Sequence, residues 1–288
     1  MRLQLVVNPT AGGGRASKLL PQVEQALGGH DLVVTPTRSL EHADELTAAA
    51  VGDDRVVVAM GGDGLVGRVA GTVAQTGGLM AVVPGGRGND FARMVGIPKD
   101  VAAACAVVAD GVETAVDLGT VDGRPFIGIA SVGFDSEVQE RVLRTRVPLG
   151  QLVYLYSALA TVFGWKHARF TVGVNGEEHS FSGWSAVVAN SGFYGGGMHI
   201  APDASVTDGL LEVVTTSATS RRHFLSALPK VFKGTHLADP SVAVTRGATV
   251  TLTADRPFRV FADGDPIGAL PCSVSVKPGA LRLLVPAT

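Results

Sequence analysis

Residues 55–88 read RVVVAMGGDGLVGRVAGTVAQTGGLMAVVPGGRG, and this stretch decides the fold class. It contains two short apolar runs, residues 55–60 and 79–83, and each run leads directly into a glycine-rich loop. A nearly continuous apolar strand is typical of a parallel sheet that helices cover on both faces. We therefore predict two parallel strands of an open α/β sheet, joined by a helix that ends at about Gln75.

The same alternation continues on both sides of this stretch. Apolar runs at residues 3–7 and 31–35 predict two more strands, each followed by a segment with helical spacing. Further helices are expected over residues 89–95 and 100–109. Residues 1–115 are therefore expected to form an open parallel α/β domain that binds a nucleotide.

The pattern changes after residue 115. Alternating segments separated by turn signals such as Asn175-Gly176 predict a mostly antiparallel β domain over residues 116–280. Helical insertions are expected near residues 136–165 and 221–233. The expected strands are 114–121, 124–131, 169–174, 178–188, 210–215, 249–253, 258–261 and 273–276. A last strand at 281–285 fits either domain, so residues 281–288 could return to the first one.

Composition narrows the class of protein. The 288 residues carry a net charge of −2, so the basic footprint of a nucleic-acid-binding protein is absent and no nucleic acid partner is expected. Cys105 and Cys272 lie in apolar surroundings, which is typical of buried thiols in a reducing compartment. No signal-peptide pattern opens the sequence, and the longest apolar stretch, residues 149–165, is shorter than the roughly 20 residues of a spanning helix. We expect a cytoplasmic protein that meets a membrane only from outside.

Glycine clusters follow three of the four predicted parallel strands, at residues 8–14, 61–64 and 85–88. The carboxyl ends of parallel strands form the ligand-binding edge of such sheets. Glycine lets backbone N–H groups approach an anion closely, and helix N-termini add partial positive charge. Three such loops indicate a polyphosphate ligand, with ordinary strand-to-helix turns as the alternative.

Two common nucleotide motifs do not account for these loops. No P-loop pattern is present. A G-x-G-x-x-G pattern occurs at Gly62, Gly64 and Gly67, but the next strand ends in Pro84-Gly85 without the carboxylate that would bind a ribose. A dinucleotide oxidoreductase is therefore disfavoured.

The loops and several later motifs resemble the diacylglycerol kinase catalytic domain family, over essentially the whole chain. The motifs that carry the resemblance are Asn8-Pro9-Thr10-Ala11-Gly12, Gly61-Gly62-Asp63-Gly64, Gly88-Asn89-Asp90-Phe91-Ala92-Arg93, Gly133-Phe134-Asp135, Gly195-Gly196-Gly197, Asp208-Gly209-Leu210-Leu211 and Asp263-Gly264-Asp265. The resemblance implies an NAD kinase-like first domain, a β-sandwich second domain and an active site in the cleft between them. It also implies ATP and Mg²⁺, and transfer of the γ-phosphate to a lipid hydroxyl such as that of diacylglycerol.

The resemblance assigns roles to several aspartates. Asp265 is expected to be the catalytic base, and Asp63 to hold Mg²⁺ or a water on it; a β-turn aspartate and a helix N-cap are the respective alternatives, and the functional role is favoured for both. Asp90 and Asp117 are expected to join Asp63 in one metal–water network, with a helix cap and a strand end as alternatives. Asp208 resembles a structural Mg²⁺ ligand, with carbonyl groups near Ser205 and Leu210 completing an oxygen shell, or else forms a plain Asp-Gly turn.

The resemblance also implies a nucleotide site on the glycine loops. Thr37, just past the second strand, is expected to contact adenine or ribose. The other expected nucleotide contacts are Asn8, Pro9, Thr10, Gly12, Gly61, Gly62, Asp63, Gly64, Gly86, Arg87, Gly88 and Asn89.

Five positions depart from the family pattern. Leu65 stands where the family has Thr, and Gly67-Arg68 where it has Asn-Glu; Arg87 replaces a Thr, and Asp265 replaces a Glu. Arg87 can place a charge on a phosphate. The departures at Leu65 and Gly67 leave open a catalytically silent lipid- or nucleotide-binding protein, and the shared G-G-D-G motif leaves open an NAD kinase-type phosphotransferase.

A segment that could contact lipid combines positive charge with apolar side chains. Arg141, Arg144 and Arg146 precede the apolar residues 149–165, a combination that suits anionic headgroups. A core helix with a solvated arginine face is the alternative. The lipid acceptor, the membrane-contact surface and a homodimer all remain open.

Overall fold

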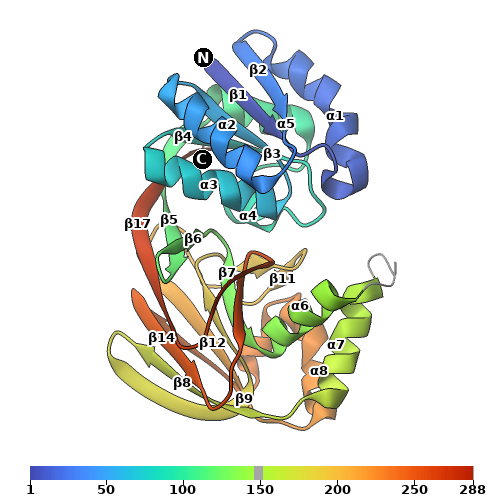
Figure 1. Ribbon diagram of the computed structural model, residues 1–288, viewed down its shortest axis with the longest axis vertical. Coiled ribbons are helices and arrows are strands. Elements are labelled where there is room, and N and C mark those ends of the chain that lie inside the picture. The colour runs from blue at the N-terminus through green and yellow to red at the C-terminus, as the bar shows by residue number, and fades with distance from the viewer. Residues whose placement is uncertain (146–151, 288) are drawn as a thin grey trace.

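The computed structural model describes residues 1–145 and 152–287, which form two lobes stacked along the long axis of the molecule (Figure 1). The first lobe is built on four parallel strands in the order β2-β1-β3-β4. These are β1 (Arg2–Val7), β2 (Asp31–Pro36), β3 (Val56–Gly61) and β4 (Leu79–Pro84). β1, β3 and β4 are apolar and almost entirely buried, as expected of parallel strands with helices on both faces.

Five helices flank this sheet and complete the parallel α/β lobe. They are α1 (Ala11–Leu27), α2 (Leu40–Gly52), α3 (Asp63–Thr76), α4 (Asp90–Met94) and α5 (Val101–Asp110). Their apolar side chains form two cores, one around Val69 of α3 and one around Val23 of α1. The open parallel sheet predicted from the glycine-punctuated strands is confirmed.

The second lobe is mostly antiparallel β structure, which also confirms the predicted fold class. Its strands are β5 (Val112–Val121), β6 (Arg124–Phe126), β7 (Ile129–Gly133), β8 (Ala168–Val174), β9 (Glu177–Ala189), β10 (Phe193–Tyr194), β11 (Met198–His199), β12 (Leu211–Ser217), β13 (Val242–Gly247), β14 (Thr249–Ala254), β15 (Arg259–Ala262), β16 (Asp265–Ala269) and β17 (Cys272–Val285).

β17 joins the two lobes. It pairs antiparallel with β14 and β5 in the second lobe, and its end pairs in parallel with β4, where Arg282 lies opposite Leu79. The segments 273–276 and 281–285, expected as separate strands, belong to this one strand. A shift in register between Lys277 and Leu281 divides them, because Gly279 has a left-handed φ of 59°.

Two other expectations about strands were wrong. The single strand expected over residues 124–131 is two strands, β6 and β7, which pair with different partners. β13 and β16 were not expected; their burial patterns are largely exposed and do not alternate between an apolar and a polar face.

Three helices pack against the β lobe: α6 (Phe134–Arg144), α7 (Leu152–Gly164) and α8 (Arg221–Val231). Phe224 of α8 stacks on Trp184 of β9 with 3.9 Å between ring centroids, and Phe134 of α6 packs edge-on against the same indole. Arg146 and the start of the apolar stretch at Leu149 lie outside the described residues. Within 1–145 and 152–287, no helix has the length and apolar character needed to cross a membrane.

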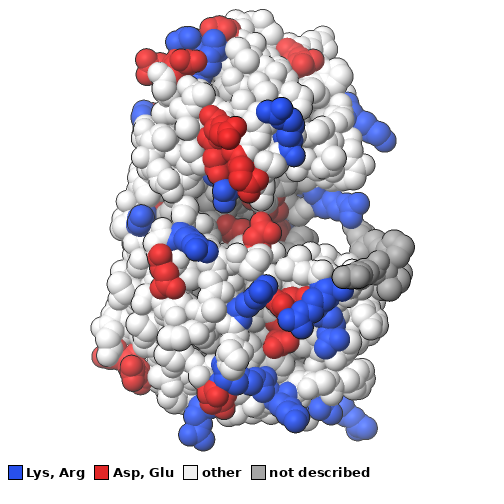
Figure 2. Space-filling model, in the orientation of Figure 1, with Lys and Arg blue, Asp and Glu red and all other residues white. Residues whose placement is uncertain are grey.

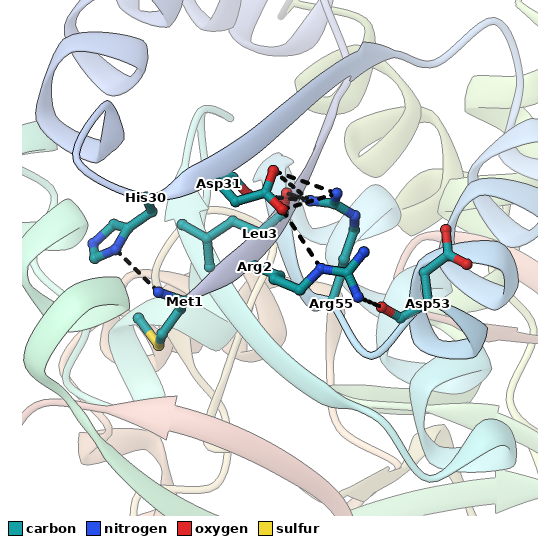
Figure 3. Close-up of polar contacts among 7 residues, drawn as sticks. All are labelled: Met1, Arg2, Leu3, His30, Asp31, Asp53 and Arg55. Atoms are coloured by element: carbon teal, nitrogen blue, oxygen red, sulfur yellow. Dashed lines mark hydrogen bonds and ion pairs between the residues drawn. The ribbon is translucent and has the colours of Figure 1, made fainter.

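The amino ends of β1, β2 and β3 are closed by a polar network (Figure 3). The Arg55 guanidinium donates to the backbone oxygens of Leu3 and Asp31 at 3.2 and 3.1 Å, and pairs with the Asp31 carboxylate at 3.2 Å. Arg2 reaches the same carboxylate at 3.5 Å. The charges at this end of the sheet therefore satisfy one another.

Candidate active site

The three glycine loops meet at the carboxyl end of the first-lobe sheet, where it faces the second lobe. The backbone N–H groups of Gly85 and Gly86 donate to the carbonyl oxygen of Gly61 at 2.8 and 2.9 Å. A Cβ at Gly86 would lie 2.4 Å from the Cα of Gly62, and a Cβ at Gly12 would lie 2.7 Å from the carbonyl oxygen of Gly85. Only glycine permits these backbones to touch.

Side chains within the loops hold their shape. The Asn8 Oδ1 atom accepts from the backbone N–H and the hydroxyl of Thr10, at 3.1 and 2.9 Å. Asn89, which is buried and left-handed at φ 51°, exchanges two hydrogen bonds with the backbone of Gly86, at 2.9 and 3.0 Å. The Thr37 hydroxyl donates to the carbonyl oxygen of Val7 at 3.1 Å.

The first loop holds three successive left-handed glycines beside a cation. Gly12, Gly13 and Gly14 have φ values of 64°, 72° and 88°. The N–H groups of Gly13 and Gly14 donate to the carbonyl oxygen of Thr10 at 3.1 and 3.2 Å, so they close the turn itself. A Cβ at Gly13 would lie 3.1 Å from the exposed Arg87 guanidinium, so a cation stands beside this loop.

Asp63 begins α3 at the point where the second and third loops meet. Its Oδ1 atom accepts from the backbone N–H of Phe91 at 3.1 Å, and its Oδ2 atom would lie 2.9 Å from a Cβ at Gly88. Burial raises the pKa of the Asp63 carboxyl, the hydrogen bond from Phe91 lowers it, and the negative charge of Asp90 raises it. A buried carboxyl with a raised pKa beside a second carboxylate fits a divalent cation, which would relieve their repulsion.

Asp90 connects the two lobes. Its Oδ1 atom pairs with the Arg93 guanidinium at 2.6 Å, and its Oδ2 atom accepts from the backbone N–H of Gly196 at 2.7 Å. Gly196 belongs to the glycine triplet of the second lobe. Both oxygens of this buried carboxylate are therefore engaged by protein groups.

Asp117 is buried at the junction of three segments of the second lobe. Its two carboxylate oxygens accept from the backbone N–H groups of Gly209 and Gly279, each at 2.7 Å. Its own N–H donates to the carbonyl oxygen of Val206 at 2.7 Å. Asp117 therefore connects the Asp208 loop, through Gly209, with the register shift of β17, through Gly279.

The Asp208 loop lies on the surface. Asp208 is exposed, and its Oδ1 atom accepts from the backbone N–H of Leu210 at 3.0 Å, while the hydroxyls of Ser205 and Thr207 lie 3.2 Å apart. Among the described residues, no three His, Cys, Asp or Glu side chains converge on one metal position. An ion at this loop would be held by the Asp208 carboxylate and backbone carbonyl groups, which is a donor set that Mg²⁺ and Ca²⁺ accept.

Asp265 stands at the start of β16, on the second lobe. Burial raises the pKa of its carboxyl, and the positive charge of Arg68 on α3 lowers it. Arg68 itself pairs with Asp44 of α2 at 2.6 Å. A cation of the first lobe therefore faces the expected base of the second.

Sequence reasoning missed Asp263, two residues earlier. Its carboxylate accepts from the backbone N–H groups of Ile127, Gly128 and Ile129 at 2.8, 2.8 and 3.2 Å. Burial raises the pKa of this carboxyl to about 6, against the lowering effect of these bonds. A Cβ at Gly67 would lie 3.2 Å from its Oδ2 atom, so the missing side chain at Gly67 makes room for Asp263. Gly67 is the one sequence signal that could have pointed to it.

The departure at Leu65 has a structural explanation. Its side chain is 3% exposed and belongs to the core of the first lobe, with Cδ2 packed on Gly61. The Leu65 side chain therefore stabilises the turn after β3 by packing between Gly61 and the core of the first lobe.

The glycine loops, Asp63 and Asp90 lie on the side of the first lobe that faces the second. Figure 2 shows a hollow between the two lobes with acidic atoms on its wall.

Residues 2–121 match the family described as the diacylglycerol kinase catalytic domain, and residues 128–285 match the YegS C-terminal NAD kinase beta sandwich-like domain.

Curated relatives agree in length as well as sequence. The chain is 34% identical over 296 residues to a diacylglycerol kinase of Mycobacterium tuberculosis, covering 99% of this chain and 95% of the relative. It is 28% identical to a diacylglycerol kinase of Bacillus subtilis, covering 94% and 91%. A crystal structure of a diacylglycerol kinase from Bacillus anthracis has a TM-score of 0.78 at 18% identity, covering 99% of this chain and 96% of that one, which shows the same fold.

Proposed function

This chain belongs to the diacylglycerol kinase catalytic domain family and is a lipid kinase, and on that premise we propose that it transfers the γ-phosphate of ATP to the hydroxyl of diacylglycerol or a related lipid. The observation that carries this proposal is the convergence of the three glycine loops beside Asp63, with Asp265 of the second lobe facing Arg68 of α3, the helix that Asp63 begins. Phosphoryl transfer requires a phosphate cradle, neutralised charge and a base near the acceptor hydroxyl.

The nucleotide phosphates bind at the carboxyl ends of β1, β3 and β4. The N-terminus of α3 supplies partial positive charge there, and the glycines of the three loops let a phosphate approach the backbone closely. Arg87 adds a full charge beside the first loop. The Oδ1 atom of Asn8 and both polar side-chain atoms of Asn89 fix the loop backbones, since they already bond within the loops.

Asp63 would hold Mg²⁺ in this site. The ion, when bound, offsets negative charge on the phosphates during transfer. Asp90 keeps the Asp63 region in register with the second lobe through Arg93 and Gly196. We assign Asp117 a positioning role, because its carboxylate is fully occupied by backbone N–H groups.

Asp265 acts on the acceptor. In its ionised form it takes the proton from the lipid hydroxyl as the hydroxyl oxygen forms a bond to the γ-phosphorus. The bond between that phosphorus and the bridging oxygen breaks, and ADP leaves with the electron pair. Asp263 holds the hairpin that carries Asp265 against residues 127–129.

The acceptor is a membrane lipid, so the enzyme works in the cytoplasm as a peripheral protein at the membrane surface. We propose a structural Mg²⁺ at Asp208, outside the transfer site. Thermal unfolding with and without a chelator tests it: an unchanged midpoint would remove the metal from this loop.

The experiment is ATP consumption with Mg²⁺ over a panel of lipid alcohols in mixed micelles. We expect turnover on at least one lipid and its loss in Asp265→Asn, with Asp255→Asn, an exposed aspartate of the same lobe, as the matched control. Turnover that survives in Asp265→Asn would show that Asp265 is not the catalytic base. ATP binding without turnover on any lipid would instead support a silent binding protein.

A further inference from the structure

One helix of the second lobe exposes an unusual amount of apolar surface. On α7, the side chains of Leu155, Tyr156 and Phe163 are 58%, 53% and 66% exposed, and Tyr154 and Leu159 are exposed as well. Large apolar side chains that gather on one surface mark interaction sites, whereas single ones are ordinary. The apolar surface of α7 therefore indicates an interaction site on this helix.

Four of the five exposed residues lie on one side of the helix. At about 100° per residue, Leu155, Tyr156, Leu159 and Phe163 fall within roughly 100° of arc. The opposite side carries Ser157 and Thr161, which are buried, together with the exposed Tyr154, and the buried Val162 borders the exposed face beside Leu155. α7 therefore has both a face that packs on the β lobe and a second apolar face without a partner among the described residues.

Basic residues flank this face on the side of α8, whereas on the side of α6 Glu137 and Glu140 line a pocket with Arg141, Arg144 and Tyr156. Residues 152–176 and 213–238, which contain α7 and α8, include no Asp or Glu. The two helices are adjacent, since Arg221 of α8 donates to the carbonyl oxygen of Trp165 at 3.4 Å just after α7. In Figure 2, blue side chains gather on this part of the second lobe. The exposed cations are Arg144, Lys166, Arg169, Arg221, Arg222, Lys230 and Lys233.

We propose that the exposed face of α7, with Phe232 and the basic residues around it, docks on an anionic lipid bilayer. This inference rests on the proposed lipid acceptor. Aromatic and aliphatic side chains enter the interface of a bilayer while Lys and Arg contact anionic headgroups. A second copy of the chain is the weaker occupant, because a symmetric contact would bring the same cations of both copies together.

The docking face lies beside the elements that carry the base. α6 follows β7 directly, and β7 pairs with β15, whose end leads to Asp263 and Asp265. Glu140 of α6 pairs with Arg259 of β15 at 3.4 Å. A cavity of about 260 Å³ opens between α6 and the β15–β16 hairpin, lined by Ser136, Glu137, Phe258 and Ala269 among others. Docking through α7 would thus place the same lobe as Asp265 at the membrane.

The test is co-sedimentation with vesicles of phosphatidylcholine alone or mixed with phosphatidylglycerol, without ATP. We expect binding only to the mixed vesicles, and at least about tenfold weaker binding for Leu155→Ser/Phe163→Ser. Val33→Ser/Leu40→Ser, two exposed apolar residues of the first lobe, is the matched control. Wild-type protein that stays in solution, or a double variant that binds like wild type, would overturn the proposal.

A charge variant separates the contributions. Lys166→Glu/Arg222→Glu should lose binding and its salt dependence, whereas Lys99→Glu/Lys277→Glu, with the same change in net charge, should not. Sedimentation velocity covers the alternative: a dimer that Leu155→Ser/Phe163→Ser dissociates would assign the face to a second copy.

Failure of docking can be told from failure of the lipid kinase proposal. Turnover on a soluble short-chain diacylglycerol should be unchanged in Leu155→Ser/Phe163→Ser, while turnover on long-chain diacylglycerol in mixed vesicles falls. Equal loss on both substrates would show damage to the site and contradict a docking role. Vesicle binding needs no turnover, so it remains decisive when no lipid is phosphorylated.

Discussion

The two ends of the parallel sheet treat polar groups in opposite ways. At the amino end, Arg55 satisfies two carbonyl oxygens and the Asp31 carboxylate, and its side chain is only 13% exposed (Figure 3). At the carboxyl end, glycine backbones touch, Gly12–14 adopt three successive left-handed conformations, and the Asp63 carboxyl has a raised pKa through burial. The same strands thus end in a closed network on one side and a strained, open one on the other.

This difference indicates which end serves stability and which serves binding. Strain and uncompensated charge persist only where a ligand or the surrounding fold offsets them. Substitutions at the carboxyl end should therefore alter ligand binding more than stability, and substitutions at the amino end should do the reverse.

The largest expected effect is at Gly86. Gly86→Ala would place a methyl group 2.4 Å from the Cα of Gly62, so two of the glycine loops must separate. We expect ATP affinity to fall by more than about tenfold, with a loss of about 1–3 kcal/mol in the free energy of unfolding. Isothermal titration calorimetry and urea unfolding measure the two effects.

Gly52→Ala is the control for this change. Its added Cβ would meet no atom within 4 Å, at the far end of α2. Gly52→Ala should leave ATP affinity unchanged. Wild-type ATP affinity in Gly86→Ala would show that the loop contacts do not shape the nucleotide site.

The next largest effect is expected at Asp117, whose carboxylate holds two segments of the second lobe together. In Asp117→Asn, an amide N–H₂ would oppose the N–H group of Gly209 or Gly279. We expect a loss of about 1–3 kcal/mol in stability, because a buried donor is left unpaired. Activity at saturating substrate should fall in proportion to folded protein, and its Mg²⁺ dependence should not move. A shifted Mg²⁺ dependence would restore Asp117 to the metal–water network.

How much of the fold and of the site the sequence predicts depends on how far apart in the sequence the interacting residues lie. The parallel sheet and its glycine loops follow from local sequence, because a buried strand and a glycine turn each have a signature within about ten residues. The position of Asp265 near the cleft rested on resemblance. The roles of Asp90 and Asp263 did not follow from either.

Those two carboxylates are defined by distant backbone groups. Asp263 accepts from Ile127, which lies 136 positions away, and Asp90 accepts from Gly196, which lies 106 positions away. In sequence, Asp263-Gly264 is a turn and Asp90 is a residue at a helix start. For Asp263 the packing within the second lobe, and for Asp90 the docking of the two lobes, distinguishes these local roles from a hydrogen bond between distant segments.

A smaller effect is expected at the amino end. Arg55→Ala removes the partner of two carbonyl oxygens and of Asp31, and we expect stability to fall by about 1–2 kcal/mol. The KM for ATP should stay unchanged, since the glycine loops lie at the other end of the sheet. Urea unfolding with steady-state kinetics checks this, and a raised KM in Arg55→Ala would show that the two ends are coupled.

The smallest effect concerns the charge that faces the base. Arg68 lowers the pKa of the Asp265 carboxyl, whereas burial raises it. Since the base acts in its ionised form, activity should rise with pH through that pKa, and Arg68→Ala should move this acid limb to higher pH. Arg68→Lys keeps the charge and should leave the limb in place. The measurement is kcat/KM against pH for the wild type and the two variants. An acid limb that does not move in Arg68→Ala would mean that the charge of Arg68 is neutralised by Asp44 and does not act on Asp265. Arg68 would then resemble Arg55, which pairs with Asp31 at the opposite end of the sheet.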